Sequence, residues 1–168
     1  QPSYIIHISD FSRKYINEQN VRKSVTIPNA IANNYFDIPV KSGMTNRLLY
    51  IGVINDRKNL LFLLKTLKSL RELEKPYSLD VCGGFGNPAY QELVENYIRE
   101  NNLQDMVKLH GWVSQTEITR LLTESDILVL PSKAETLPMA IAETMAAGRF
   151  AIASGKFRGN RKNTWLFT

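Results

Sequence analysis

Cysteine is nearly absent from this 168-residue sequence, and the one present, Cys82, cannot form a disulfide bond within the chain. A lone thiol is typical of proteins that fold in a reducing compartment, so we expect a cytoplasmic location. The sequence also has no apolar run near the roughly 20 residues that a membrane-spanning helix needs. No signal peptide is visible at its start. These absences argue against a disulfide-stapled scaffold and against a helix that crosses a membrane.

Histidine is almost as scarce, and acidic residues are missing from the end of the chain. His7 and His110 lie in apolar, strand-like stretches without another ligand at metal-binding spacing, so we expect core or strand-end histidines and no metal site. No acid follows Glu143, and the five lysines and arginines beyond it account for the whole net charge of +5. A basic end alone does not predict nucleic-acid binding, and an anionic membrane surface fits it equally well. Trp112 and the tyrosines are scattered, and we expect them in the core or at its rim.

What the sequence does contain is a regular alternation of strand-like and helical segments. Strands are expected at 47–53, 78–84, 106–113, 126–132 and 150–154, and helices at 59–73, 89–101, 118–125 and 138–148. Ser114 and Glu117 form a capping box ahead of the third helix. Strands that alternate with helices of this length indicate βαβ units and a parallel sheet covered on both faces. The predicted fold class is therefore α/β, a Rossmann-like three-layer parallel sheet.

The first part of the chain is organised differently. We expect a strand at 4–9, a helix from Asp10 to about Asn20, and a short strand that ends in the Pro-Asn turn of 24–31. Residues 33–46 contain Pro39, Gly43 and few periodic apolar residues, and we interpret them as a linker. The chain opens with glutamine almost directly in a strand, which is typical of a piece of a longer protein.

The most informative stretch is ETLPMAIAE at 135–143, where two acids bracket a turn and the start of an alanine-rich helix. Burying the Glu143 carboxylate among Met, Ile and Ala is unfavourable unless something hydrogen-bonds to it, and two hydroxyls of a sugar or ribose can do so. Glu135 follows a strand, at the usual ligand crevice of an open α/β sheet. The pattern points to a polyol ligand that carries phosphate. A surface acid at Glu143 and a structural loop acid at Glu135 are the alternatives.

Backbone groups in the same stretch add to this candidate site. Pro138 suits the first position of a helix. The N–H groups of Thr136, Leu137 and Met139 are then available to a phosphate or sugar oxygen at the helix start.

A glycine-rich turn forms a second candidate. Residues 84–89 fit G-x-G-x-x-A between a strand and a helix, the context of a dinucleotide site. The next strand supplies Lys108 and His110 but no carboxylate for a ribose, which argues against a nicotinamide site. Two interpretations remain for Gly84 and Gly86: a turn that lets the backbone approach a ligand phosphate, and a tight strand–helix turn without a ligand.

The third candidate is the basic turn before the first long helix. Arg57 and Lys58 lie at a helix N-terminus, where two cations oppose the helix macrodipole. A bound anion would make this placement favourable. The alternative is a solvated basic turn in which Asp56 caps the helix.

Together these segments resemble the C-terminal domain of a GT-B glycosyltransferase of family 4, also called glycosyltransferase group 1. IPNAI at 27–31 is similar to the linker of that family, and 48–64 to its first strand and the lysine-bearing start of its first helix. SDILVLPSKAETLPMAIAETMAAG at 125–148 is similar to its donor-site segment, with Glu135 and Glu143 as the E-x7-E pair. SLDVCGGFG and LQDMVKLHGWVSQTEI match further segments, and the likeness covers residues 3–154.

The resemblance implies an enzyme that transfers a sugar from a nucleotide-sugar, such as a UDP- or GDP-sugar, to a glycan or lipid-linked acceptor. Transfer would retain the anomeric configuration and use neither metal nor other cofactor. Lys58, helped by Arg57, would contact the diphosphate and stabilise the charge of the leaving group. Glu135 would lie against the transferred sugar, and Glu143 would bind the ribose hydroxyls.

The resemblance also assigns the surroundings of the donor. The backbone at Thr136, Leu137 and Met139 would lie near sugar and phosphate, the turn at Gly84 and Gly86 would face the nucleotide, and the strand end at Val113 would border the base. Residues 1–32 would hold the end of an N-terminal domain and the interdomain linker. Residues 33–168 would form an incomplete C-terminal nucleotide-sugar-binding domain, separated from the domain that binds the acceptor.

Three positions depart from the family pattern. Val53 replaces a common arginine, Thr136 replaces a common glycine, and residues 155–168 match no family segment, as in a divergent, truncated or frame-shifted end. We therefore keep two alternatives, a non-catalytic GT-B-like structural or binding module and a nucleotide-sugar epimerase relative. The expected role of the full enzyme is surface polysaccharide or lipopolysaccharide synthesis, with peripheral association at the inner face of a membrane.

Overall fold

The computed structural model of the chain describes residues 4–9, 23–75, 77–135, 138–154, 156–157 and 164–167, with side chains up to residue 154. The strands are β1 (Tyr4–His7), β2 (Lys23–Thr26), β3 (Arg47–Ile51), β4 (Ser78–Cys82), β5 (Val107–Gly111), β6 (Ile127–Leu130), β7 (Ala134–Glu135), β8 (Phe150–Ser154), β9 (Lys156–Phe157) and β10 (Thr164–Phe167). The helices are the 3-10 helix η1 (Asn33–Tyr35) and the α-helices α2 (Leu60–Glu72), α3 (Pro88–Glu100), α4 (Gln115–Glu124) and α5 (Met139–Ala146).

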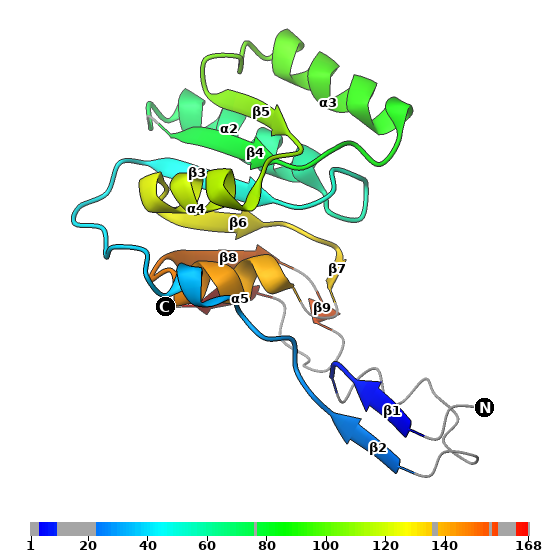
Figure 1. Ribbon diagram of the computed structural model, residues 1–168. Coiled ribbons are helices and arrows are strands. Elements are labelled where there is room, and N and C mark those ends of the chain that lie inside the picture. Colours follow the sequence, from blue (N-terminus) through cyan, green and yellow to red (C-terminus); the bar gives the residue numbers. More distant parts are fainter. Residues whose placement is uncertain are drawn as a thin grey trace.

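The main sheet has the strand order β10-β8-β6-β3-β4-β5. Its strands β8, β6, β3, β4 and β5 run parallel, and β10 pairs antiparallel with β8 at the edge. Right-handed crossovers place α2 and α3 on one face and α4 and α5 on the other, and Figure 1 shows α4 and α5 in front of the sheet with α2 behind it. The predicted parallel α/β sheet with helices on both faces is confirmed.

The core lies between this sheet and its two helical layers. Leu49 and Tyr50 of β3, Val81 of β4 and Leu64 of α2 are all fully buried. A strand covered on both faces must be apolar at successive positions, which explains the continuous apolar runs of the sequence.

Local signals set the helix starts. The side chain of Asn87 accepts the N–H of Tyr90 ahead of Pro88, and the hydroxyl of Ser114 accepts the N–H of Glu117 at 3.2 Å. The other hydrogen bond of a capping box would join the Glu117 carboxylate to the backbone N–H of Ser114. Here that carboxylate pairs with Arg120 at 2.6 Å instead.

Both histidines lie in strands and are shielded from solvent, as predicted. His7 of β1 is 2% exposed. Nε2 of His110 in β5 lies 2.7 Å from Oδ1 of Asp80, whose second oxygen accepts a bond from Arg47 at 2.8 Å. Burial alone would raise the pKa of Asp80, but the bonds from His110 and Arg47 bring it below its usual range. His110 is therefore part of a structural network across β3, β4 and β5.

β1 and β2 confirm the two strands predicted ahead of the linker, and they form a separate parallel pair, apart from the main sheet in Figure 1. The linker and the end of the chain hold more structure than expected. The linker of 33–46 contains η1, and Tyr35 is 1% exposed, so part of this segment belongs to the core. Beyond Ser154, β10 adds an antiparallel edge strand to the main sheet, and β9 forms a two-stranded sheet with β7. The helix predicted from Asp10 to Asn20 lies outside the described residues.

A buried arginine fastens the linker to the helices. Arg149 is 5% exposed, and its guanidinium donates to the carbonyls of Leu122, Thr123, Ala147 and Pro39 at 2.9–3.3 Å. Burial lowers its pKa. The Arg149 guanidinium therefore supplies hydrogen-bond donors to the carbonyls at the C-terminal ends of α4 and α5, and it binds the linker to both helices.

We predict that Arg149→Met lowers the free energy of unfolding by about 3 kcal/mol, because it leaves several buried carbonyls without a donor. Urea unfolding followed by circular dichroism measures the change. Lys68→Met, on the exposed face of α2, is the matched control and should change stability by less than about 0.5 kcal/mol. Equal stability of both variants would contradict the role given to Arg149.

Candidate functional site

The candidate site lies where the strand order of the sheet reverses. β3 pairs with β4 on one side and with β6 on the other, and the helices that follow these strands leave on opposite faces. In open α/β sheets, ligands bind at the carboxyl ends of the strands beside such a switch point. The loop after β3 carries Arg57 and Lys58, and the segment after β6 carries Glu135.

The two loops meet in a largely buried ion pair. Nζ of Lys58 lies 2.5 Å from Oε1 of Glu135, and their side chains are 15% and 8% exposed. The guanidinium of Arg57 lies 3.7 Å from the second Glu135 oxygen and donates to the carbonyl of Ala134 at 2.8 Å. The predicted basic turn and the first acid of the E-x7-E pair are thus brought together.

Backbone contacts hold this arrangement in place. The N–H of Lys133 donates to the carbonyl of Arg57 at 2.8 Å and joins the two loops. The side chain of Asn55 accepts the N–H of Lys58 at 3.0 Å. The predicted cap by Asp56 is wrong, because Asp56 points outward and pairs with Nζ of Lys133 at 2.7 Å. On the other loop, β7 pairs with β9, so Glu135 also has backbone support from the end of the chain.

Two glycines lie beneath the ion pair, at the ends of β3 and β4. Gly52 follows β3, and a Cβ added to it would lie 3.8 Å from Nζ of Lys58, so the ammonium rests directly over this backbone. Gly83 has a φ of +141°, and a Cβ there would come within 2.0 Å of the carbonyl oxygen of Gly52. Only glycine allows the ends of β3 and β4 to approach this closely.

The glycine-rich turn is paired with the loop after β3. The N–H of Gly86 donates to the carbonyl of Ile54, and the N–H of Ile54 donates to the carbonyl of Gly84, both at 2.8 Å. Gly84 is buried under the indole of Trp112, whose Nε1 would lie 2.1 Å from an added Cβ. Because the Gly86 amide already has an acceptor, the hydrogen bonds favour the tight-turn interpretation. That Gly84 and Gly86 face a nucleotide remains a prediction.

Glu143 belongs to a second cluster. It is half-buried on α5, where burial raises its pKa and a hydrogen bond from the hydroxyl of Tyr35 lowers it. The Tyr35 hydroxyl also accepts a hydrogen bond from the amide of Gln115. In the part of the chain that the structure describes, no cation lies within ion-pair distance of Glu143. Glu143 is therefore not the solvated surface acid that the sequence analysis kept as an alternative.

The remaining predicted residues surround these clusters. Met139 opens α5 and is half-buried, and Val113 is half-buried between β5 and α4. Thr136 and Leu137 lie outside the described residues. Tyr35 and Gln115 are the residues that sequence reasoning missed. The available signal for Tyr35 was the pair of aromatic residues at 35 and 36 in the linker.

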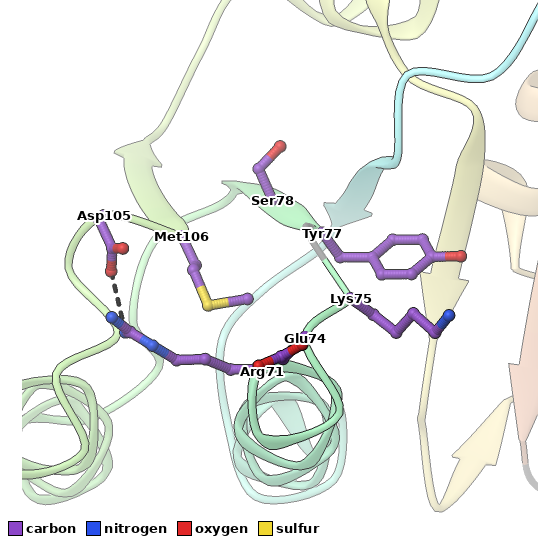
Figure 2. A pocket seen from close by; sticks show the side chains of 7 residues that line it. All are labelled: Arg71, Glu74, Lys75, Tyr77, Ser78, Asp105 and Met106. Atoms are coloured by element: carbon purple, nitrogen blue, oxygen red, sulfur yellow. Dashed lines mark hydrogen bonds and ion pairs between the residues drawn. The ribbon is translucent and has the colours of Figure 1, made fainter.

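A cavity at the other end of the sheet is a separate feature. It has a volume of about 410 Å³, and Figure 2 shows its lining of Arg71, Glu74, Lys75, Tyr77, Ser78, Asp105 and Met106. Arg71 and Asp105 form an ion pair of 3.1 Å across it. Ser78 is the first residue of β4, so this cavity lies at the amino ends of the strands and contains no predicted site residue.

Two observations concern metals and membranes. Among residues 4–9, 23–75, 77–135 and 138–154, no three His, Cys, Asp or Glu side chains lie where they could hold a metal ion together. The described helices include none with the length and apolar character needed to cross a membrane.

Comparison with known protein families shows to which family the chain belongs. The family model for glycosyl transferases group 1 matches residues 32–162. The chain belongs to this family. The match includes η1, the ion pair and both acids of the E-x7-E motif. It runs past Ser154 to residue 162, so the expectation that the family pattern ends at 154 is wrong for residues 155–162.

Two curated glycosyltransferases are similar to parts of the chain. The amylovoran biosynthesis glycosyltransferase AmsK of Erwinia amylovora is 30% identical over 114 residues, which are 64% of this chain and 27% of AmsK. The Escherichia coli UDP-Gal:alpha-D-GlcNAc-diphosphoundecaprenol alpha-1,3-galactosyltransferase is 33% identical over 105 residues, 62% of this chain and 26% of that enzyme. The chain thus spans about a quarter of the length of these relatives.

Solved structures show the same fold. A glycosyltransferase from Rickettsia africae superposes with a TM-score of 0.73 at 21% identity, over 90% of this chain and 44% of that one. The pneumococcal O-GlcNAc transferase GtfA, solved in complex with UDP and GlcNAc, gives 0.72 at 19% identity, over 90% of this chain and 30% of GtfA. The predicted fold, a Rossmann-like domain of a GT-B group 1 glycosyltransferase, is confirmed.

We predict that Lys58→Met destabilises the chain by about 3 kcal/mol, since it leaves the buried Glu135 carboxylate with only the more distant Arg57. Adding Glu135→Gln should restore most of this loss, because the unpaired charge is then gone. Urea unfolding of the two single variants and the double variant measures the coupling. Strictly additive effects would show that the pair makes no energetic contact.

Proposed function

We propose that the chain is the donor-binding domain of a retaining glycosyltransferase, one that transfers a hexose from a nucleotide-sugar to a glycan or lipid-linked acceptor. The observation that carries this proposal is the Lys58–Glu135 ion pair at the switch point of the sheet. It places a cation and an acid, with Arg57 beside them, where group 1 members of this fold would meet a sugar diphosphate.

The chemistry of the pair fits a diphosphate ligand. An ammonium has three N–H donors, and Glu135 uses one, so Lys58 has others for phosphate oxygens. Arg57 is 54% exposed and adds a second cation. Charges already in position stabilise a leaving diphosphate without reorganisation when the glycosidic bond breaks. This role accounts for two cations at the start of α2 and for a buried ion pair that burial alone does not favour.

The two acids would have different roles. Glu135 is held against Lys58 and would face the transferred sugar, together with the backbone at Thr136, Leu137 and Met139. Glu143, half-buried and without a cation among its described neighbours, would accept the ribose hydroxyls. Val53 is 37% exposed at the position of the common family arginine. Diphosphate binding therefore rests on Lys58 and Arg57.

The names of the relatives support a choice of donor and acceptor class. One is a UDP-galactose transferase acting on a diphosphoundecaprenol-linked sugar, and another acts in amylovoran synthesis. We propose a UDP-sugar as the first donor to test and a surface polysaccharide or lipopolysaccharide as the product. The reaction would need no metal or other cofactor. It would take place in the cytoplasm at the inner face of the membrane, with the acceptor on an N-terminal domain that precedes residue 33.

We predict that the 168-residue chain binds UDP and that Lys58→Ala and Glu143→Gln each weaken binding about 10- to 100-fold, the range for losing a hydrogen bond with a charged partner. Titration calorimetry with UDP, GDP and ADP measures this. Lys68→Ala, an exposed lysine on α2, is the matched control and should bind like the parent. No binding by any of the three nucleotides would favour a non-catalytic module, and robust sugar transfer by this chain alone would contradict the need for a second domain.

The raised pKa of Glu143 predicts a pH dependence. The ionised carboxylate accepts ribose hydroxyls, so UDP affinity should fall as pH drops through a pKa above that of an ordinary glutamate. Glu143→Gln should lack this step, which distinguishes titration of Glu143 from titration of the phosphate.

The same raised pKa also affects folding stability. Because burial disfavours the charged form of Glu143 in the folded state, the contribution of this group to stability declines as pH rises through its folded-state pKa. The melting temperature of Glu143→Gln at pH 7 should therefore equal or exceed that of the parent.

A further inference from the structure

Tyr35 comes from the linker and lies on η1, which packs against α5, the helix that carries Glu143 of the candidate donor site. It is the last residue of η1, between the small β1–β2 sheet and the main sheet, and it is 1% exposed. Its N–H donates to the carbonyl of Ala32 at 3.2 Å, and η1 packs against α5. A buried phenol hydroxyl needs hydrogen-bond partners, and those of Tyr35 come from two other elements.

The two partners fix the direction of the hydroxyl. Gln115, the first residue of α4, donates its amide N–H to the Tyr35 oxygen. The hydrogen of the phenol then remains for the Glu143 carboxylate on α5, the helix against which η1 packs, and a hydrogen bond from this hydroxyl lowers the pKa of Glu143. A linker residue, the start of α4 and the middle of α5 thus meet at one hydroxyl, that of Tyr35.

Electrostatics favour this assignment of donor and acceptor. Burial raises the pKa of Tyr35, and the adjacent Glu143 raises it further, so the phenol remains protonated and able to donate. The same bond opposes the effect of burial on Glu143 and favours its ionised form. A carboxylate has about four acceptor positions, so one bond from Tyr35 leaves room for two ribose hydroxyls.

The linker beyond Tyr35 is rigidly attached. Arg149 donates to the carbonyl of Pro39, Lys41 pairs with Asp126 at 2.7 Å, and the N–H of Thr45 donates to the same carboxylate at 2.8 Å. Tyr35 is therefore the first core residue after the turn at 27–32, where the linker joins the main body.

We propose that Tyr35 is a positioning residue: its hydroxyl, oriented by Gln115, holds the Glu143 carboxylate in the direction that a donor ribose requires. This inference rests on the proposed function, since it names how the same site sets its ribose-binding acid. It also makes ribose binding dependent on the placement of η1, so that the segment leading from the β1–β2 sheet acts on the donor site through one hydroxyl.

The first test needs no ligand. In the full chain with 13C-labelled glutamate, NMR titration follows the Glu143 carboxyl, assigned by its loss in Glu143→Gln. Tyr35→Phe should raise the pKa of Glu143, and Gln115→Ala should raise it less. Tyr77→Phe, which removes a half-buried hydroxyl at the opposite end of the sheet, is the matched control. An unchanged Glu143 pKa in Tyr35→Phe would overturn the proposal.

The second test compares UDP with 2′,3′-dideoxyuridine diphosphate, which lacks the ribose hydroxyls. Tyr35→Phe should weaken UDP binding about tenfold and leave the dideoxy analogue unaffected, and it should have no further effect in a Glu143→Gln background. Equal weakening of both ligands, or of neither, would overturn the positioning role. If the parent chain binds no nucleotide while the Glu143 pKa still shifts in Tyr35→Phe, the Tyr35–Glu143 contact stands, and the ribose role falls with the proposed function.

Discussion

The ion pair between Lys58 and Glu135 is the constraint on which the candidate site depends. It joins two loops that lie 77 residues apart in the sequence, and both side chains are largely shielded from water. Removing two charges from water can cost more free energy than their attraction returns, so a fold gains little stability from such a pair. Its value is positional. The pair holds a cation over the end of β3, beside the switch point of the sheet.

Small residues make this geometry possible. Gly83 lets the ends of β3 and β4 come into backbone contact, and the Lys58 side chain rests over Gly52. The loops after these strands then exchange hydrogen bonds between Ile54 and the turn at 84–86. One side of the site therefore consists of hydrogen-bonded backbone from the ends of β3 and β4 and the turn at 84–86, and the charged side chains lie over this backbone.

Much of the fold was predictable from sequence, because parallel strands and amphipathic helices have local periodic patterns. The meeting of Lys58 and Glu135 was predictable as well, since topology brings loops after neighbouring strands to one edge. Other features depend on distant partners. The pairing of Asp56 with Lys133, the burial of Tyr35 in an apparent linker and the antiparallel strand β10 all arise from contacts across the chain. No short window of sequence contains that information.

The buried guanidinium of Arg149 has a consequence for protein engineering. It binds carbonyls from the linker and from two helix ends, so these three segments form one indivisible unit. Chimaeras that exchange acceptor domains between group 1 enzymes should therefore be joined upstream of Asn33. A junction between 36 and 46 would divide the segment whose Pro39 carbonyl accepts from the arginine, and so disturb the one contact of this unit that comes from the linker.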